Sequence, residues 1–140
     1  MAEYIAPATQ TVAAGSNVLF TDTVVSGPCS VYHRPDSGLV TLRGMTKQAR
    51  ARFKVSFNGN IAIPTGSTAG ALSFAIATGG EAMQSTTMTV TPADVEEYFN
   101  ISSSVFLDVP AGCCSLISVK NTSTIPALIE NANLMVERVA

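Results

Sequence analysis

Apolar and polar side chains alternate with a period of two along much of the chain, which is typical of β-strands with one buried face. The clearest case is residues 50–57, where every second side chain is apolar. The pair Asn58-Gly59 follows directly and predicts a tight hairpin turn. A second alternating segment, residues 72–77, ends at two consecutive glycines. We therefore expect two well-defined strands in the middle of the chain.

Turn-forming residues divide the rest of the chain at intervals of roughly 8–12 residues, a spacing typical of a β-sandwich or barrel. The further strands that this spacing predicts are residues 17–20, 29–33, 39–43, 84–91, 98–109, 115–121, 127–131 and 134–139. One short helical turn is expected at residues 91–94, because Thr91 can cap a turn whose first residue is Pro92.

The last segment of the sequence, residues 133–140, is apolar enough that it would fray unless it were paired inside a sheet. We expect it to be an interior strand beside an early strand such as residues 17–20. Joining both ends of a chain in one sheet is typical of jelly rolls. The predicted fold is therefore all-β, a jelly-roll antiparallel β-sandwich over residues 11–140, preceded by an N-terminal arm or first edge segment at residues 1–10.

Charged residues are scarce in this sequence. Its 140 residues are 46% hydrophobic and 13% charged, whereas about 25% charged is usual for a soluble domain. The hydrophobic content excludes disorder, and the absence of a long apolar run argues against a transmembrane helix. The N-terminus lacks the basic and apolar regions of a signal peptide. A weakly charged surface of this kind suits burial against protein partners, because copies repel each other little.

The few charges are sorted along the chain. Residues 31–54 hold six basic residues and one acid, a net charge of +5, and the remainder carries −7, which gives the formal charge of −2. We expect this basic stripe to face acidic groups of the same fold or of a neighbouring subunit, because the aromatic residues typical of nucleic-acid binders are not interleaved with it. The candidate interface residues of the stripe are Arg43, Lys47, Arg50, Arg52 and Lys54.

The residue types that carry chemistry do not form a site in the sequence. An odd number of cysteines, Cys29, Cys113 and Cys114, argues against a disulfide framework, so we expect reduced thiols in the core or at an interface. The single histidine, His33, lies four residues after Cys29, which along a strand is about 13 Å. That distance is too long for a Cys–His dyad, and we expect His33 in a polar turn.

Acidic and glycine-rich segments also lack a catalytic pattern. Glu96 and Glu97 are sequence neighbours, whereas paired catalytic carboxylates face each other across a cleft. The glycine-rich residues 66–70 have neither the lysine nor the helix of a phosphate-binding loop. We therefore expect a binding protein rather than an enzyme, with no catalytic residue, cofactor or metal.

Several segments resemble compact jelly-roll domains related to tumour necrosis factor. The segments similar to the opening strands, the late hairpin and the closing strand of those domains are residues 11–20, 105–122 and 132–139. Two further segments, residues 39–44 and 60–66, resemble those of small structural proteins from phages and prophages of Gram-positive gut bacteria. The resemblance implies a trimeric jelly roll with a role on a particle surface. Because the collagen-like Gly-X-Y repeat of fibre proteins is missing, a stand-alone cap or decoration is favoured.

The sequence thus predicts a homotrimeric capsid decoration protein that binds the major capsid protein or another virion protein and can stabilise the capsid. It would be assembled in the bacterial cytoplasm and lie on the virion surface, without nucleic-acid or membrane partners. A candidate particle-docking arm contains Tyr4, Ile5 and Pro7. The apolar residues expected to fill either the sandwich core or the three-fold axis are Phe53, Val55, Phe57, Phe74 and Phe106.

The alternative function is an adhesin-like or fibre-tip module that recognises a host-surface glycan. Such modules usually present exposed aromatic side chains, and this chain has three Tyr and no Trp.

Overall fold

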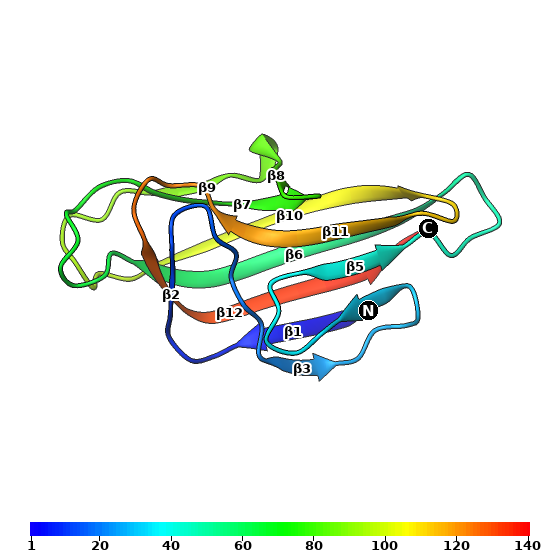
Figure 1. The fold of residues 1–140 in the computed structure, drawn as a ribbon, viewed down its shortest axis with the longest axis horizontal. Coiled ribbons are helices and arrows are strands. Elements are labelled where there is room, and N and C mark those ends of the chain that lie inside the picture. The colour runs from blue at the N-terminus through cyan, green and yellow to red at the C-terminus, as the bar shows by residue number, and fades with distance from the viewer.

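Three long strands form the centre of the structure, a computed structural model that describes residues 1–140. They are β6 (Arg50–Ala62), β10 (Phe99–Pro110) and β12 (Ala127–Arg138). In β6 every second residue from Ala51 to Ile61 is buried, as the period-two pattern of the sequence requires. Figure 1 shows the long strands running along the longest axis of the molecule, with both chain termini at the same end.

The first sheet, which we call sheet A, is antiparallel and has the strand order β10-β6-β12-β1-β3, with β2 also paired to β12. Its shorter strands are β1 (Ala2–Ala6), β2 (Gln10–Val12) and β3 (Asp22–Val25). The C-terminal strand therefore lies inside the sheet, as predicted, because β6 and β1 cover its two edges. Its N-terminal neighbours are β1 and β2 rather than residues 17–20.

The second sheet, sheet B, is antiparallel with the order β4-β5-β11-β7-β8, and β9 also pairs with β7. Its strands are β4 (Val31–His33), β5 (Val40–Arg43), β7 (Leu72–Thr78), β8 (Glu81–Ala82), β9 (Met88–Val90) and β11 (Cys114–Asn121). A single turn of 3-10 helix, η1 (Gln84–Thr86), lies between β8 and β9. The hydroxyl of Thr86 accepts the Ile76 N–H at 2.9 Å, so η1 replaces a ladder partner at this edge.

The core between the two sheets is one cluster of 28 buried residues. Phe53, Val55, Phe57 and Phe74 all belong to it, so these four predicted apolar residues are core residues and not axis residues. Phe106 is different, because 61% of it is exposed. The predicted all-β antiparallel sandwich is confirmed, as are the strands at residues 50–57 and 72–77.

The prediction of a hairpin turn at Asn58-Gly59 is wrong. Both residues lie inside β6, whose two edges are paired with β10 and β12 at this point. Pairing on both sides outweighs the local turn preference of the dipeptide. The glycine has a packing reason instead, because a Cβ on Gly59 would lie 3.2 Å from Ile129 Cδ1, next to the irregular register of β12.

Two other local predictions also fail. Residues 2–6 are neither a free arm nor an edge segment, because β1 pairs with β12 on one side and with β3 on the other. Residues 91–94 form no helix, and the short helical turn of the chain is η1 instead. No helix in the structure has the length and hydrophobicity needed to cross a membrane.

Candidate assembly surface

The outward-pointing side chains of β10, β6 and β12 form a face that we call the outer face of sheet A. Its middle is neutral and consists of serine, asparagine and methionine side chains. Ser104 of β10 lies opposite Ser56 of β6, which lies opposite Met135 of β12. The next outward row is Ser102, Asn58 and Asn133. This neutral middle, with hydroxyls and amides, can approach the same region of a copy without strong repulsion.

Phe106 is the large apolar side chain on this face. It lies opposite Lys54 of β6, and Lys54 lies opposite Glu137 of β12. Its exposed fraction of 61% is the highest of the large apolar side chains in the chain. Its neighbours Val105 and Leu107 point the other way and pack against the core. Phe106 thus contributes nothing to the core of its own chain and is available to a partner.

The free edge of β10 adjoins Phe106. β10 pairs only with β6, and no backbone hydrogen bond outside the strand ladders involves residues 99–109. Within the strand, Asp108 is the only charge and Pro110 the only proline. Soluble proteins usually blunt an edge of this length with lysines, prolines or a covering element, since an open edge pairs readily with another chain. This edge and the outer face of sheet A together form the candidate assembly surface.

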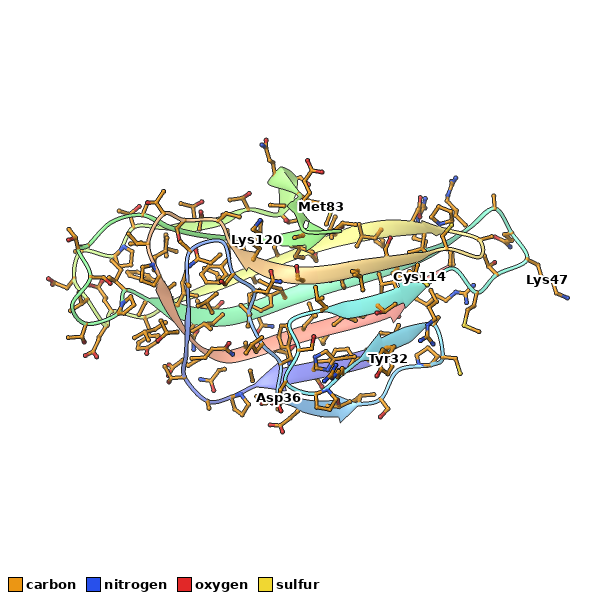
Figure 2. All side chains as sticks on the ribbon, in the orientation of Figure 1. Tyr32, Asp36, Lys47, Met83, Cys114 and Lys120 are labelled. Atoms are coloured by element: carbon orange, nitrogen blue, oxygen red, sulfur yellow. The ribbon has the colours of Figure 1, made fainter.

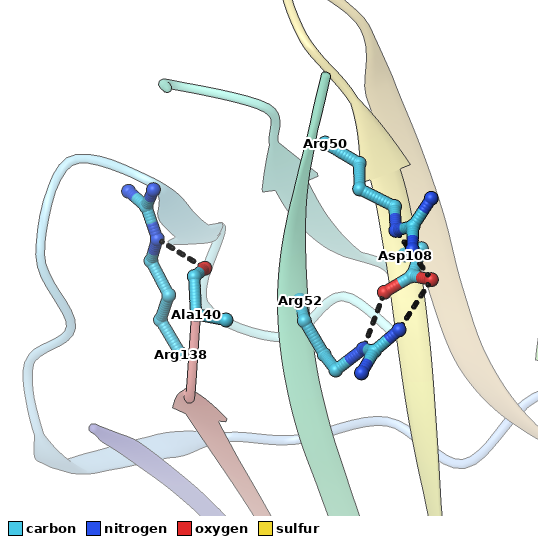
Figure 3. Close-up of polar contacts among 5 residues, drawn as sticks. All are labelled: Arg50, Arg52, Asp108, Arg138 and Ala140. Atoms are coloured by element: carbon cyan, nitrogen blue, oxygen red, sulfur yellow. Dashed lines mark hydrogen bonds and ion pairs between the residues drawn. The ribbon is translucent and has the colours of Figure 1, made fainter. Parts of the chain in front are cut away.

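A charge cluster lies at one end of this surface (Figure 3). Arg52 donates to both Asp108 oxygens, at 2.7 and 3.0 Å, and Arg50 Nε lies 3.1 Å from the same carboxylate. The hydrogen bond from Arg52 lowers the pKa of Asp108 and raises the pKa of Arg52. Because all three side chains are exposed, solvent screens the pair and its effect on stability is small. Two guanidinium groups share one carboxylate, so the cluster keeps a positive charge.

Several solved structures of other proteins have a similar fold. No protein-family model and no curated protein matches the sequence. The globular domain of the zebrafish complement 1qA protein superposes with a TM-score of 0.64 at 9% identity, over 96% of this chain and 94% of that one. Murine APRIL at pH 5.0 gives a TM-score of 0.54 at 10% identity, over 92% and 98%. Rabbit GITRL gives 0.52 at 12% identity, over 100% and 95%.

The fold is a tumour-necrosis-factor-like jelly roll. At these identities the likeness shows the fold alone, so the function must be argued from the surface of this chain.

The predicted basic stripe is divided between different parts of the jelly roll. Arg50, Arg52 and Lys54 share the outer face of sheet A. Arg43 lies in sheet B, where its guanidinium stands 5.6 Å above the centre of the Tyr32 ring. Lys47 is exposed in the loop between β5 and β6, and Figure 2 shows it projecting from one end of the molecule. The stripe is therefore not one continuous surface, because β5 belongs to sheet B whereas β6 belongs to sheet A.

The three residues of the predicted arm lie in different environments. Tyr4 is only 3% exposed, its ring centre is 4.6 Å from that of His33, and burial raises its pKa. It therefore anchors β1 in the core and is not available for docking. Ile5 points outward and is half-buried, and Pro7 is exposed; both line a pocket of about 270 Å³ beside Asn133.

The cysteines and the histidine also differ from their predicted places. Cys29, Cys113 and Cys114 are all free and exposed. Of the two predicted places for these thiols, the core is therefore wrong, and the interface stays a prediction. Cys29 and Cys113 lie outside the strands and Cys114 begins β11 on the outward side, so none points into the sandwich. His33 is buried instead of lying in a polar turn, and its Nε2 donates to the Ser37 carbonyl at 2.8 Å.

Proposed function

We propose that this protein is a structural component of a phage particle, a homotrimer that decorates the head surface. The observation that carries the proposal is the candidate assembly surface, where an open twelve-residue strand edge adjoins the exposed Phe106. The assignment to a phage is supported by the resemblance of residues 39–44 and 60–66 to small phage proteins. We propose a role in binding and not in catalysis.

The size of the surface agrees with self-assembly. Strands of about twelve residues are about 40 Å long, and three neighbouring strands are about 14 Å wide. The resulting patch of about 560 Å² is of the same order as the ~800 Å² that each partner contributes to a standard interface. In a closed ring, each copy would cover the β10 edge of its neighbour, so that no such edge is left open. Three copies meeting in this way would also remove Phe106 from water.

Attachment to the particle would use surface that remains free after assembly. Lys47 stands at the end of the molecule towards which both chain termini lie, and Arg43 is the last residue of strand β5 of sheet B, which leads into the Lys47 loop (Figures 1 and 2). This end is basic, so an acidic surface of the major capsid protein or of another virion protein fits it. The protein would then lie on the virion surface, after assembly in the bacterial cytoplasm.

Co-sedimentation with undecorated phage heads tests this function. We expect the protein to pellet with the heads, and we expect Lys47→Glu to weaken this binding and its dependence on salt. Lys120→Glu makes the same charge change on sheet B, at a position that Figure 2 shows away from the end that carries Lys47, and should bind like the wild type. A protein that stays in the supernatant, or equal binding by both variants, would contradict the proposed attachment.

A further inference from the structure

A cleft of about 870 Å³ lies away from the candidate assembly surface. Its walls are the segment from Gln10 to Leu19 and the loop from Arg34 to Leu39. Figure 2 shows Asp36 in that loop, beside the blue segment that leads from β2 to β3. The volume falls within the range of small-molecule sites, about 300–1,000 Å³.

The two walls are tied to each other by backbone hydrogen bonds. The Phe20 N–H donates to the Ser37 carbonyl at 3.2 Å, and the Asp36 N–H donates to the Phe20 carbonyl at 3.0 Å. Gly38 permits this close approach, because a Cβ there would lie 2.8 Å from the Val18 carbonyl oxygen. The cleft is therefore a defined feature of the fold and not a gap between independent loops.

Gln10 braces the longer wall. Its side-chain Nε2 donates to the Leu19 carbonyl at 2.8 Å, and its Oε1 accepts the Leu19 N–H at 3.0 Å. On the other wall the Ser37 hydroxyl accepts the Leu39 N–H at 3.0 Å. Walls that are already held in place lose little conformational freedom when a ligand binds, which favours binding.

The polar groups that remain free in the cleft include both hydrogen-bond donors and hydrogen-bond acceptors. Arg34 and Asp36 are exposed, and neither has an ion-pair partner. The lining also contains the hydroxyls of Thr11 and Ser16 and the amide of Asn17. Asp36 has a left-handed backbone with φ of 64°, a conformation that Asp and Asn tolerate better than most residues. The cleft thus offers hydrogen-bond donors and acceptors with a formal charge that cancels.

Two leucines supply apolar surface in the same place. Leu19 is 46% exposed and Leu39 is 41% exposed, and both line the cleft, one from each wall. Large exposed aliphatic side chains beside free polar groups suit a ligand that has hydroxyls on its rim and C–H groups on its face.

We propose that this cleft binds a neutral saccharide. The carboxylate of Asp36 accepts hydrogen bonds from sugar hydroxyls, Arg34 and Asn17 donate to them, and the leucines pack against the C–H face of the ring. A ligand with net charge is disfavoured because the charges of Arg34 and Asp36 cancel each other. The site does not depend on assembly or on a particle, so it stands apart from the proposed function.

Titration of the isotope-labelled full-length protein with a panel of neutral oligosaccharides tests the proposal. The panel contains tetramers of β-1,4-linked glucose, mannose, xylose and N-acetylglucosamine, together with galactose-containing oligosaccharides. We expect at least one of them to shift the NMR signals of the Gln10 side-chain amide and of the Leu19 and Ser37 backbone amides. This mapping uses the wild-type protein and so does not depend on how any variant folds.

Variants then identify the residues that bind. We expect Arg34→Ala to weaken the affinity for the same oligosaccharide about tenfold or more, because it removes a charged donor, and Asp36→Asn to weaken it about fivefold, because it replaces a charged acceptor with a neutral one. Asn keeps the left-handed backbone at position 36, and Asp94→Asn, an exposed residue outside the cleft, is the matched control that should bind like the wild type. Shifts that map elsewhere, affinity unchanged in both cleft variants, binding of charged glycans or zwitterionic peptides only, or no binding would each overturn the proposal.

Discussion

Replacing Phe106 with serine should separate assembly from folding. Serine already occupies two other outward positions on β10, Ser102 and Ser104, so the strand accommodates it. Because 61% of Phe106 is exposed in the single chain, the substitution removes little from the core. Exposed substitutions of this kind change the stability of the chain by about 0.5 kcal/mol or less.

The effect on assembly should be much larger. A phenylalanine presents about 200 Å², so an exposed fraction of 61% leaves about 120 Å² for a partner to cover. At about 25 cal/mol per Å², covering it is worth about 3 kcal/mol per subunit. Three subunits together lose about 9 kcal/mol, which corresponds to about a millionfold weaker trimer association.

Sedimentation equilibrium over a range of protein concentrations measures this change. Circular dichroism of the same samples shows whether the fold is kept. Leu116→Ser is the matched control, because it removes a half-exposed side chain from the outer face of sheet B. A Phe106→Ser variant that associates like the wild type, or a Leu116→Ser variant that dissociates equally, would show that the assembly does not depend on Phe106.

Three further substitutions test the fold and its charges. Gly44→Ala would place a Cβ 2.0 Å from the Pro110 carbonyl oxygen, so we expect a loss of about 3 kcal/mol in denaturant unfolding; Gly70→Ala, whose nearest neighbour is 3.8 Å away, should be nearly neutral. Burial raises the pKa of Tyr4. The contribution of the neutral Tyr4 phenol to the stability of the fold is therefore complete below about pH 10 and is lost as the pH rises further. Tyr4→Phe should therefore unfold less readily than the wild type in alkaline titrations, and equal curves would show that β1 does not hold Tyr4 in the core. Arg52 lowers the pKa of Asp108, so the pair stabilises the fold above about pH 4 and loses that effect as the pH falls through the lowered pKa. Thermal unfolding of Asp108→Asn should accordingly depend less on pH in this acidic range, and an unchanged dependence would contradict the pairing.

The alternation of apolar and polar residues along the chain was enough to predict the sandwich and much of its core. In β6 the apolar side chains recur at every second position, and the core side of a strand follows directly from that period. β1 was missed as a strand because small residues, Ala2 and Ala6, flank Tyr4 on its buried side and give a weak signal. The Asn58-Gly59 turn failed because strands remote in sequence pair with both edges of β6, which no local pattern records.

The candidate assembly surface was only partly visible in the sequence. Val105, Phe106 and Leu107 form a continuous apolar run, and such a run does not show which member points away from the core. The pairing of β10 with β6 was needed to show that Phe106 is the residue that points away from the core. No pattern in the sequence indicates the cleft. Arg34 and Asp36 line it together with Asn17 because a backbone hydrogen bond joins Phe20 to Ser37. Sites built from two loops depend on tertiary contacts that a period-two pattern does not contain.

Self-assembly through the outer face of sheet A and the edge of β10 sets the mass of the wild-type protein in solution. Multi-angle light scattering during size-exclusion chromatography, at micromolar concentration, gives this mass without reference to shape. We predict one species with three times the chain mass of 14.5 kDa. A stable species of 14.5 kDa at the same concentration would show that the chain does not assemble by itself.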